Sequence, residues 1–278
     1  MDNIEYLGMG NMDRISRALE KNRARRPRSK NFLDQLEDRI KSQPLENIEY
    51  TQTHQIQVPQ NVLSENRVIA GNRSDPRAAA FKFLRTQVLH AMRNNNWSSL
   101  AITGPQADIG KSLVAVNLAV SMSLEVNQTV LLVDLDLRHP SLNRYFGFDP
   151  EFGIADYLRG EIEIKKLFVS PGFQRLVLVP GKGTTSDSSE LLSSPKMTDL
   201  SRELQNRYSN RIVIFDLPPL LNIDDAMVFL PNVDSTLLVV ENGKNTESDV
   251  TKSMRLLAGT NLIGTVLNKA EDEILDYY

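Results

Sequence analysis

The sequence has 278 residues and no cysteine. Disulfide bonds, a cysteine nucleophile and a thiolate metal site are therefore excluded, and the composition is compatible with a reducing compartment such as the cytosol. No apolar run reaches the roughly 18 residues that a membrane-spanning helix needs. The N-terminal stretch MDNIEYLGMGNMDRI also lacks the basic start and apolar centre of a signal peptide. We therefore expect a cytoplasmic protein that reaches the inner face of a membrane only through a partner or a surface contact.

Aromatic residues are few, at 6% of the chain, but the 41% hydrophobic and 24% charged content is ordinary for a globular protein. The net charge of −3 is unevenly distributed along the chain. Residues 14–30, RISRALEKNRARRPRSK, contain eight Lys or Arg and one Glu, which leaves a charge of −10 for the remainder. Such a run attracts an anionic membrane surface or an acidic partner, and the alternative is a solvated basic helix. We expect no nucleic-acid partner.

The first 75 residues differ in pattern from the rest of the chain. Helical periodicity is present at 13–26 and again at 31–40, and the segment that follows is polar and aperiodic as far as residue 76. That segment is typical of a linker or of an arm wrapped over a domain. The sequence therefore predicts a helical or irregular N-terminal extension and linker (1–75), a main domain (76–270) and a short acidic tail that ends in two tyrosines (271–278).

From residue 76 onward, short apolar segments alternate with helical ones. The strand candidates are rich in Val, Ile and Leu, and cover residues 99–103, 129–134, 175–180, 211–216, 235–240 and 262–268. The helix candidates cover residues 76–95, 111–125, 196–208, 223–230 and 247–258. Strands that are apolar on both faces, with helices between them, predict an α/β fold with a mainly parallel sheet and helices on both faces. Ligands in such sheets bind beyond the carboxyl ends of the strands.

The stretch ITGPQADIGKS, residues 102–112, has the strand, loop and helix context of a phosphate-binding loop (P-loop). Gly110, Lys111 and Ser112 fit the end of the pattern G-x-x-x-x-G-K-[ST], whereas its first glycine is displaced by one place to Gly104. Backbone N–H groups and the helix N-terminus of such a loop attract phosphate oxygens. The Lys111 charge then acts on the β and γ phosphates, and the Ser112 hydroxyl binds Mg²⁺. Asp108 adds a negative charge close to this site.

Carboxylates follow two later strands of the predicted sheet. The stretch VLLVDLDLRHP places Asp134 and Asp136 two residues apart, so both side chains point at one cation if the strand continues. The stretch RIVIFDLPPLL ends an apolar run in Asp216, which is the form of a Walker B strand. Unrelieved carboxylate pairs repel each other, and a metal ion removes the repulsion. The sequence thus predicts a Mg²⁺ site built from Ser112 and these three carboxylates.

Together these motifs resemble the bacterial tyrosine kinase (BY-kinase) family of the CpsD/CapB type, over roughly residues 74–270. Besides the end of the P-loop, the shared motifs are a Walker A′ sequence with Asp134, Asp136 and Arg138, and a Walker B sequence with Asp216, Pro218 and Pro219. The resemblance implies a P-loop NTPase fold of the SIMIBI/MinD-like type, with ATP and Mg²⁺ as cofactors. The implied activity is that of an ATP-dependent protein tyrosine autokinase regulating capsule or exopolysaccharide synthesis and export.

The resemblance also implies roles for individual residues. The implied catalytic residues are Lys111, Asp134, Asp136 and Asp216. The two Walker A′ aspartates, Asp134 and Asp136, would lie around the metal and the tyrosine hydroxyl. The implied nucleotide-binding residues are Gly104, Asp108, Ile109, Gly110, Lys111, Ser112, Leu113, Arg138 and Asn268. The tail residues Tyr277 and Tyr278 are the implied phosphoacceptors. The implied partner is a membrane adaptor of the polysaccharide co-polymerase type, with possible self-association of the chain.

The sequence departs from the family pattern at two places. The tail holds two tyrosines rather than a cluster, and the ring-forming pattern E-x-x-R-x-x-R is matched by Ala79, Lys82 and Arg85, without its acidic residue. These departures leave open an ATP-binding regulator of the same pathway with little kinase activity. A ParA- or MinD-like positioning ATPase is a further alternative, although Gln106 stands where those proteins carry a second loop lysine.

Overall fold

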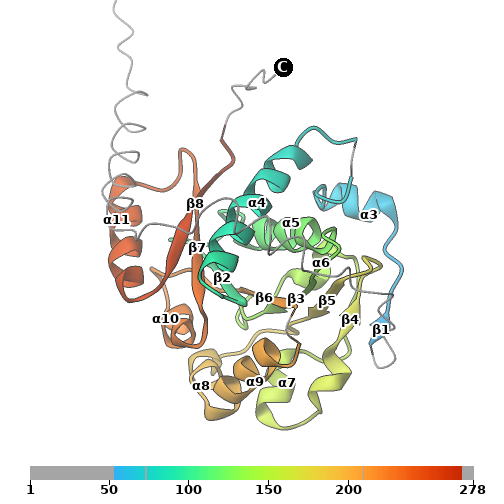
Figure 1. The fold of residues 1–278 in the computed structure, drawn as a ribbon. Helices are drawn as coiled ribbons and strands as arrows, with labels where there is room; N and C mark the ends of the chain where they lie inside the picture. Colours follow the sequence, from blue (N-terminus) through green and yellow to red (C-terminus); the bar gives the residue numbers. More distant parts are fainter. Residues whose placement is uncertain (1–52, 73, 209, 271–278) are drawn as a thin grey trace, which may run out of the picture.

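The computed structural model describes residues 53–72, 74–208 and 210–270. Its centre is an eight-stranded sheet with the order β1-β4-β5-β3-β6-β2-β7-β8 (Figure 1). The strands are β1 (His54–Gln55), β2 (Ser99–Thr103), β3 (Thr129–Asp134), β4 (Val169–Ser170), β5 (Leu176–Val179), β6 (Arg211–Asp216), β7 (Ser235–Glu241) and β8 (Leu262–Asn268). Every neighbouring pair is parallel except β4 with β5. The prediction of a mainly parallel sheet is confirmed.

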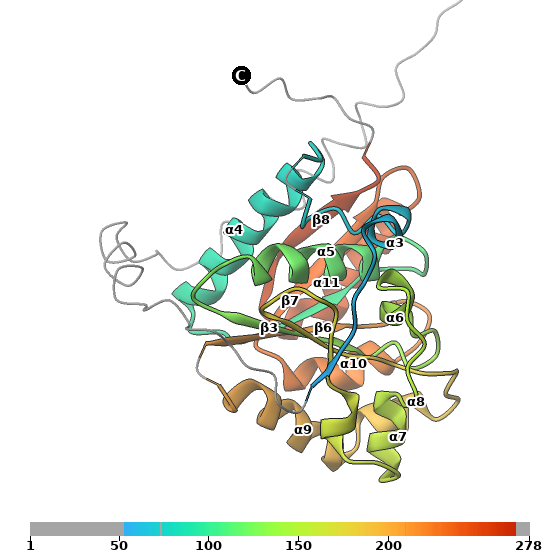
Figure 2. The same cartoon turned by 90° about the vertical axis from the view of Figure 1, so that its right-hand side faces the viewer.

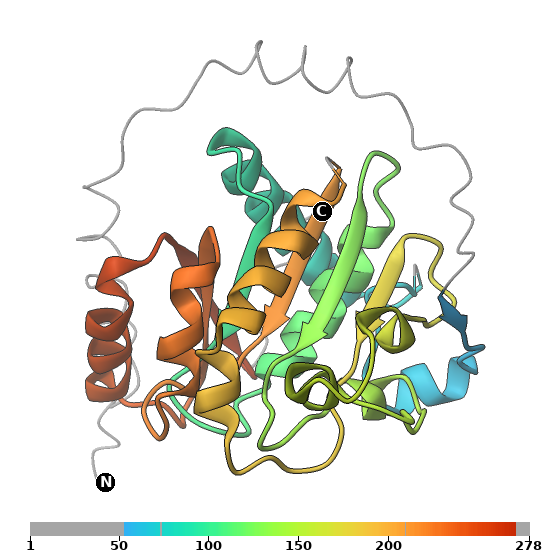
Figure 3. The ribbon, with the colours of Figure 1, turned by 90° about the horizontal axis from the view of Figure 1, so that it is seen from below.

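Helices cover both faces of this sheet (Figures 2 and 3). One face carries α3 (Gln60–Glu65), α4 (Ala78–Asn94), α5 (Lys111–Ser123) and α6 (Leu142–Tyr145). The other face carries α7 (Ile154–Arg159), α8 (Ser188–Leu192), α9 (Pro195–Asn206), α10 (Asp225–Phe229) and α11 (Glu247–Leu256). Three 3₁₀ turns are η1 (Ile164–Leu167), η2 (Leu230–Asn232) and η3 (Leu257–Gly259).

Strand β2 shows why these apolar runs fold as they do. Leu100 and Ile102 belong to the core below α4 and α5, whereas Ala101 between them belongs to the core on the opposite face. Successive side chains of a strand point to opposite faces, so a strand buried on both sides must be apolar at every position. All five residues of β2 are buried. The apolar runs in the sequence therefore reflect a sheet that is covered by helices on both faces.

Most predicted elements lie where the sequence placed them, and four strand candidates match β2, β3, β6 and β8 at both ends. The helix expected at 223–230 is shorter, because α10 spans Asp225–Phe229 and continues as η2. No sequence pattern predicted β1, β4 or the short helices α6 to α8. These elements are at most six residues long, too short for a periodicity to be read.

Part of the segment expected to form a linker or an arm lies against the domain. Strand β1 pairs in parallel with β4, and Leu63 and Val68 join the hydrophobic core. The buried side chain of Asn117, on α5, accepts hydrogen bonds from the backbone N–H groups of Ile69 (2.8 Å) and Ala70 (3.0 Å). This arm therefore contacts the helix that follows the P-loop.

Several predictions fall on residues outside the described part of the chain. They are the helices at 13–26 and 31–40, the basic run 14–30 and the tail 271–278 with its two tyrosines. The boundaries of the three predicted parts stay predictions. No helix within the described ranges is long and apolar enough to cross a membrane.

Candidate active site

The P-loop joins the end of β2 to the start of α5, as predicted. Gly110 has φ +86°, a left-handed conformation that favours glycine, and a Cβ there would lie 2.1 Å from Nδ2 of Asn268. Gly104, the displaced glycine, also has a packing reason. A Cβ on Gly104 would lie 2.5 Å from the carbonyl oxygen of Val239, so only glycine lets the loop pass this close to β7. Both glycines are thus required by the fold of the loop.

Side chains from the ends of β7 and β8 hold the carbonyl groups of the loop. Nδ2 of Asn268 donates to the carbonyl of Ile109 at 2.8 Å, and Nζ of Lys269 donates to the carbonyl of Asp108 at 3.0 Å. Nζ of Lys244 donates to the carbonyl of Ala107, also at 3.0 Å. Asn268, a predicted nucleotide-binding residue, therefore lies at the P-loop, where its side chain contacts a loop carbonyl.

The N–H groups of the loop have no such partners. The backbone N–H groups of residues 106–110 donate no hydrogen bond to any described residue. Helix α5 has no side-chain cap, so its first N–H groups, which include those of Lys111, Ser112 and Leu113, are also unpaired within the helix. Unpaired N–H groups in a row at a helix N-terminus are what a phosphate group needs.

Lys111 is buried at the base of this loop, with 6% of its surface exposed. Its one hydrogen bond within the described residues is a long one of 3.5 Å from Nζ to the carbonyl oxygen of Gln106, and it forms no ion pair with them. A buried ammonium group is costly unless a charge partner is present. Lys111 is close enough to lower the pKa of Asp216, but no described carboxylate pairs with it directly, so its ammonium group is available to an anionic ligand.

Asp134 is the last residue of β3 and is completely buried. Its Oδ2 accepts hydrogen bonds from the backbone N–H groups of Ser141 (2.8 Å) and Leu142 (3.0 Å), so it fixes the start of α6. Burial is the main cause that raises the pKa of Asp134 to about 7; the neighbouring charge of Asp136 adds to the rise, and the backbone hydrogen bonds oppose it. The carboxyl group is therefore poised to exchange a proton near neutral pH.

Asp136 does not lie on a continuation of the strand, because β3 ends at Asp134. Asp134 and Asp136 would lie on one face only if the strand continued to Asp136, and it does not. Asp136 is half-buried, and its Oδ1 accepts from the backbone N–H of His139 at 3.0 Å in the loop after β3. It is still close enough to raise the pKa values of both Asp134 and Asp216. The carboxylates are brought together by the loop rather than by strand alternation.

Asp216 ends β6 and lies directly opposite Asp134 in the register of β3 and β6. It is completely buried, and neither of its oxygens has a hydrogen-bond partner of good geometry. Burial raises its pKa well above the usual value, Asp134 and Asp136 raise it further, and Ser112 and Lys111 lower it. A buried carboxylate without donors calls for a cation or a proton.

These residues fit a Mg²⁺ ion shared with a nucleotide. Magnesium is usually bound by one or two carboxylates, a hydroxyl, waters and the phosphates of the substrate, rather than by a cage of protein ligands. The two unpartnered oxygens of Asp216, near the Ser112 hydroxyl, match that arrangement. Across the described ranges, no three His, Cys, Asp or Glu side chains gather into a complete metal site. The metal assignment of Ser112, Asp134, Asp136 and Asp216 stays a prediction that this geometry supports.

Arg138, a predicted nucleotide-binding residue, is held by Asp225 on α10. Its Nε lies 3.0 Å from Oδ2 and its Nη2 3.3 Å from Oδ1 of that buried carboxylate, which also accepts from the Ser188 hydroxyl. Sequence reasoning missed Asp225 and Ser188. The available signal was the Asp-Asp pair, Asp224 and Asp225, shortly after the Walker B stretch.

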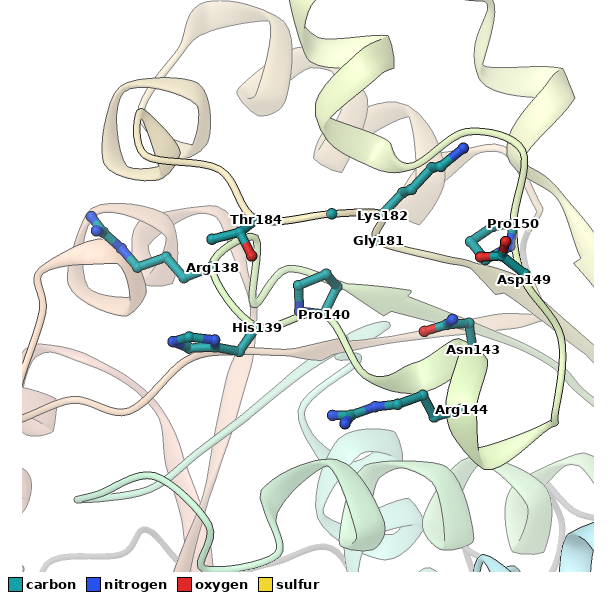
Figure 4. Close-up of a pocket in the computed structure, with 11 residues that line it drawn as sticks. Arg138, His139, Pro140, Asn143, Arg144, Asp149, Pro150, Gly181, Lys182 and Thr184 are labelled. Atoms are coloured by element: carbon teal, nitrogen blue, oxygen red, sulfur yellow. The ribbon is translucent and has the colours of Figure 1, made fainter.

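A polar pocket of about 330 Å³ opens beside these loops (Figure 4). Its walls come from the loop after β3, from helix α6 with the segment that follows it, and from the loop after β5, and include Arg138, His139, Pro140, Arg144 and Lys182. No sequence motif predicted it, because its two walls are about forty residues apart in the chain.

Arg85, on α4, is one of the positions that match the ring-forming pattern. Its guanidinium lies 3.1 Å from Oε1 of Glu125 and donates to the carbonyl of Ser121 at 3.0 Å. The side chain is thus engaged within its own chain.

Known proteins were compared with this chain. No protein-family model matches it. The sequence is 34% identical over 199 residues to the tyrosine-protein kinase Etk of Escherichia coli K12, and the match covers 71% of this chain. The solved kinase domain of E. coli Etk has a TM-score of 0.68 and 29% identity, with 88% of this chain and 89% of that domain covered. Over the matched residues the chain is similar to the kinase domains of bacterial tyrosine kinases.

Two further comparisons define this relationship. The putative tyrosine-protein kinase CapB of Staphylococcus aureus is 28% identical over 201 residues, which cover 71% of this chain and 87% of CapB. The cell-division ATPase MinD of Pyrococcus furiosus has a TM-score of 0.52 and 25% identity over 61% of this chain and 70% of that chain. The kinase family and the MinD-like P-loop fold predicted from the sequence are both confirmed. The chain spans 27% of the length of Etk.

Proposed function

We propose that this chain is an ATP-dependent protein tyrosine kinase. The observation that carries the proposal is the pairing of a P-loop with free N–H groups and a buried, unpartnered Asp216 directly across from Asp134. The first feature suits phosphates, and the second suits the cation that accompanies them. Phosphoryl transfer depends mainly on positioning and charge neutralisation, and both are supplied by this arrangement.

Each residue has a defined task in this proposal. Lys111 and the N–H groups of the P-loop bind the phosphates, and Asn268 keeps the loop in shape. Ser112 and Asp216 would hold Mg²⁺, which when bound neutralises charge on the β and γ phosphates. Asp134, whose pKa is raised to about 7 mainly by burial, orients the acceptor hydroxyl and takes its proton, and the charge of Asp136 adds to that rise.

The wider setting is also part of the proposal. The family resemblance supports a role in capsule or exopolysaccharide synthesis and export, with activation by a membrane adaptor at the inner face of the cell membrane. The basic run 14–30 would add attraction to anionic lipid of about 1 kcal/mol for each charge near the surface. Tyr277 and Tyr278 are the proposed phosphoacceptors, and self-association would bring the tail of one copy to the site of another.

Incubation of the full chain with labelled ATP and Mg²⁺ tests the proposed activity. Label on tyrosine is the expected result, and Asp134→Asn is expected to reduce it by about 10²–10⁴-fold, the usual range for a general base. Release of free phosphate without labelled protein would instead indicate an ATPase, and binding without turnover would indicate a nucleotide-dependent regulator.

A further inference from the structure

The polar pocket lies beside Asp134 on the side away from the P-loop. In the sheet, β3 and β5 are neighbours, whereas β2, which leads into the P-loop, lies beyond β6. Gly181 links the pocket to the carboxylate, since a Cβ there would lie 2.5 Å from Cβ of Pro140 and 3.5 Å from Cγ of Asp134. Asp134 therefore stands between the phosphate-binding loop and the pocket.

Two cations in the pocket have no carboxylate partner among the described residues. Arg144 and Lys182 are exposed on opposite walls, and neither forms an ion pair there (Figure 4). Nζ of Lys182 donates only to the carbonyl oxygen of Glu151. Arg138, by contrast, is already bound to Asp225, and Asp149 is the one carboxylate in the lining. The pocket thus has an excess of positive charge that is available to a ligand.

We propose that this pocket binds acidic side chains next to the acceptor tyrosine, so that the kinase selects tyrosines in acidic sequence. The inference rests on the proposed function. Gly181 and Pro140 of the pocket wall cover the completely buried Asp134, so a tyrosine that approaches the carboxylates from the side opposite the P-loop would pass its neighbouring residues close to Arg144 and Lys182. Consecutive residues of an extended peptide advance by about 3.3–3.6 Å, so carboxylates one to three residues away fall within the width of such a pocket.

The chain itself contains a peptide of this chemistry. Its last eight residues, EDEILDYY, hold four carboxylates immediately before two tyrosines. Basic side chains on the pocket wall and acidic side chains on the acceptor are complementary, and charge complementarity supplies specificity more than affinity. The peptide EDEILDYY and its neutral counterpart QNQILNYY are therefore a matched pair of probes.

Fluorescence anisotropy of the two labelled peptides, with the full chain, Mg²⁺ and a non-hydrolysable ATP analogue, measures the preference. We expect EDEILDYY to bind about five- to tenfold more tightly than QNQILNYY, the sum of two exposed charge pairs, and the preference to shrink as salt is added. The double variant Arg144→Gln, Lys182→Gln should bind the two peptides equally. Arg202→Gln is the matched control, because Arg202 is exposed on α9 and pairs with Asp199, outside the pocket.

Equal affinity of the wild-type chain for the two peptides, or an unchanged preference in the double variant, would overturn the pocket assignment. Neither binding result depends on phosphoryl transfer. If tyrosine is labelled in the same preparation, the proposed kinase function is retained even when the pocket assignment fails. Acid-selective binding with no tyrosine labelling of either peptide would contradict the kinase function, and the substrate assignment with it.

Discussion

Arg138 and Asp225 form a bidentate ion pair that ties the loop after β3 to helix α10. The guanidinium Nε and Nη2 lie 3.0 and 3.3 Å from the two carboxylate oxygens, and the Asp225 side chain is completely buried. The same loop carries Asp136 and begins at Asp134, the residue proposed to accept the tyrosine proton. The pair therefore stabilises the conformation in which the loop presents these carboxylates.

Asp225→Asn should weaken both the fold and the site. The substitution leaves the guanidinium with a neutral partner, but Arg138 is one-third exposed and regains water, so we expect a loss of about 1–3 kcal/mol in the free energy of unfolding. Urea denaturation measures this, and steady-state kinetics should show a fall in kcat larger than any change in KM for ATP. Asp224→Asn is the control, because the Asp224 side chain hydrogen-bonds the Ser189 hydroxyl and acts on Arg138 only through its charge, without a hydrogen bond. Equal effects of the two substitutions would argue against a positioning role for Asp225.

Lys111→Met should weaken ATP binding by roughly 10–150-fold while the fold survives. Lys111 makes a single long contact of 3.5 Å in the described structure, so its loss costs the fold little. Its charge on the phosphates is worth about 1.5–3 kcal/mol, typical of a charged hydrogen bond. Titration calorimetry with ATP gives the affinity, and circular dichroism checks the fold. Unchanged affinity in a folded Lys111→Met protein would remove the P-loop assignment.

Stability should depend on pH through Asp134. Its pKa is about 7 in the folded chain and near 3.8 in the unfolded chain, so the folded state binds more protons between these values. The free energy of unfolding must then fall as pH rises from about 4 to about 7, and the contribution levels off above that range. Denaturation of the nucleotide-free protein at about pH 5 and about pH 8 should show this loss, and Asp134→Asn should reduce it. The same pH dependence in both proteins would show that Asp134 is not responsible.

Gly110→Ala should disrupt the P-loop through a steric contact in addition to backbone strain. Gly110 has φ +86°, and the new Cβ would lie 2.1 Å from Nδ2 of Asn268, which holds the loop carbonyl of Ile109. We expect a loss of about 2–4 kcal/mol in stability and a loss of ATP binding.

Gly243→Ala separates the two causes. Gly243 has φ +74° with nothing within 4 Å of its Cβ position, so it reports strain alone, about 1–2 kcal/mol. Equal losses in the two variants, with ATP binding retained by Gly110→Ala, would show that the contact with Asn268 is unimportant.

The sequence was most informative where one physical demand acts on consecutive residues. A strand covered on both faces must be apolar throughout, so the bounds of β2, β3, β6 and β8 were predictable. The P-loop was likewise predictable, because Gly110, Lys111 and Ser112 are adjacent and each has a separate chemical requirement.

The sequence was least informative where the structure joins residues that are far apart in the chain. Arg138 and Asp225 are 87 positions apart, and Asn117 and Ile69 are 48 apart, so no local pattern could reveal either contact. The geometry of Asp134 and Asp136 depended on where β3 ends, and strand ends are set by the neighbouring loops as much as by local preference. The pocket beside Asp134 could not be predicted for the same reason.

The most direct test of the account is mass spectrometry of phosphotyrosine after incubation of the full chain with ATP and Mg²⁺, in parallel with Asp216→Asn. The substitution removes the charge of a completely buried carboxylate that has no hydrogen-bond partner, so the fold should be retained or slightly stabilised. We expect phosphotyrosine in the wild-type chain, mainly at Tyr277 and Tyr278, and a loss of about 10²-fold or more in the variant. Absence of phosphotyrosine from the wild-type chain, or equal phosphorylation of a folded Asp216→Asn protein, would contradict it.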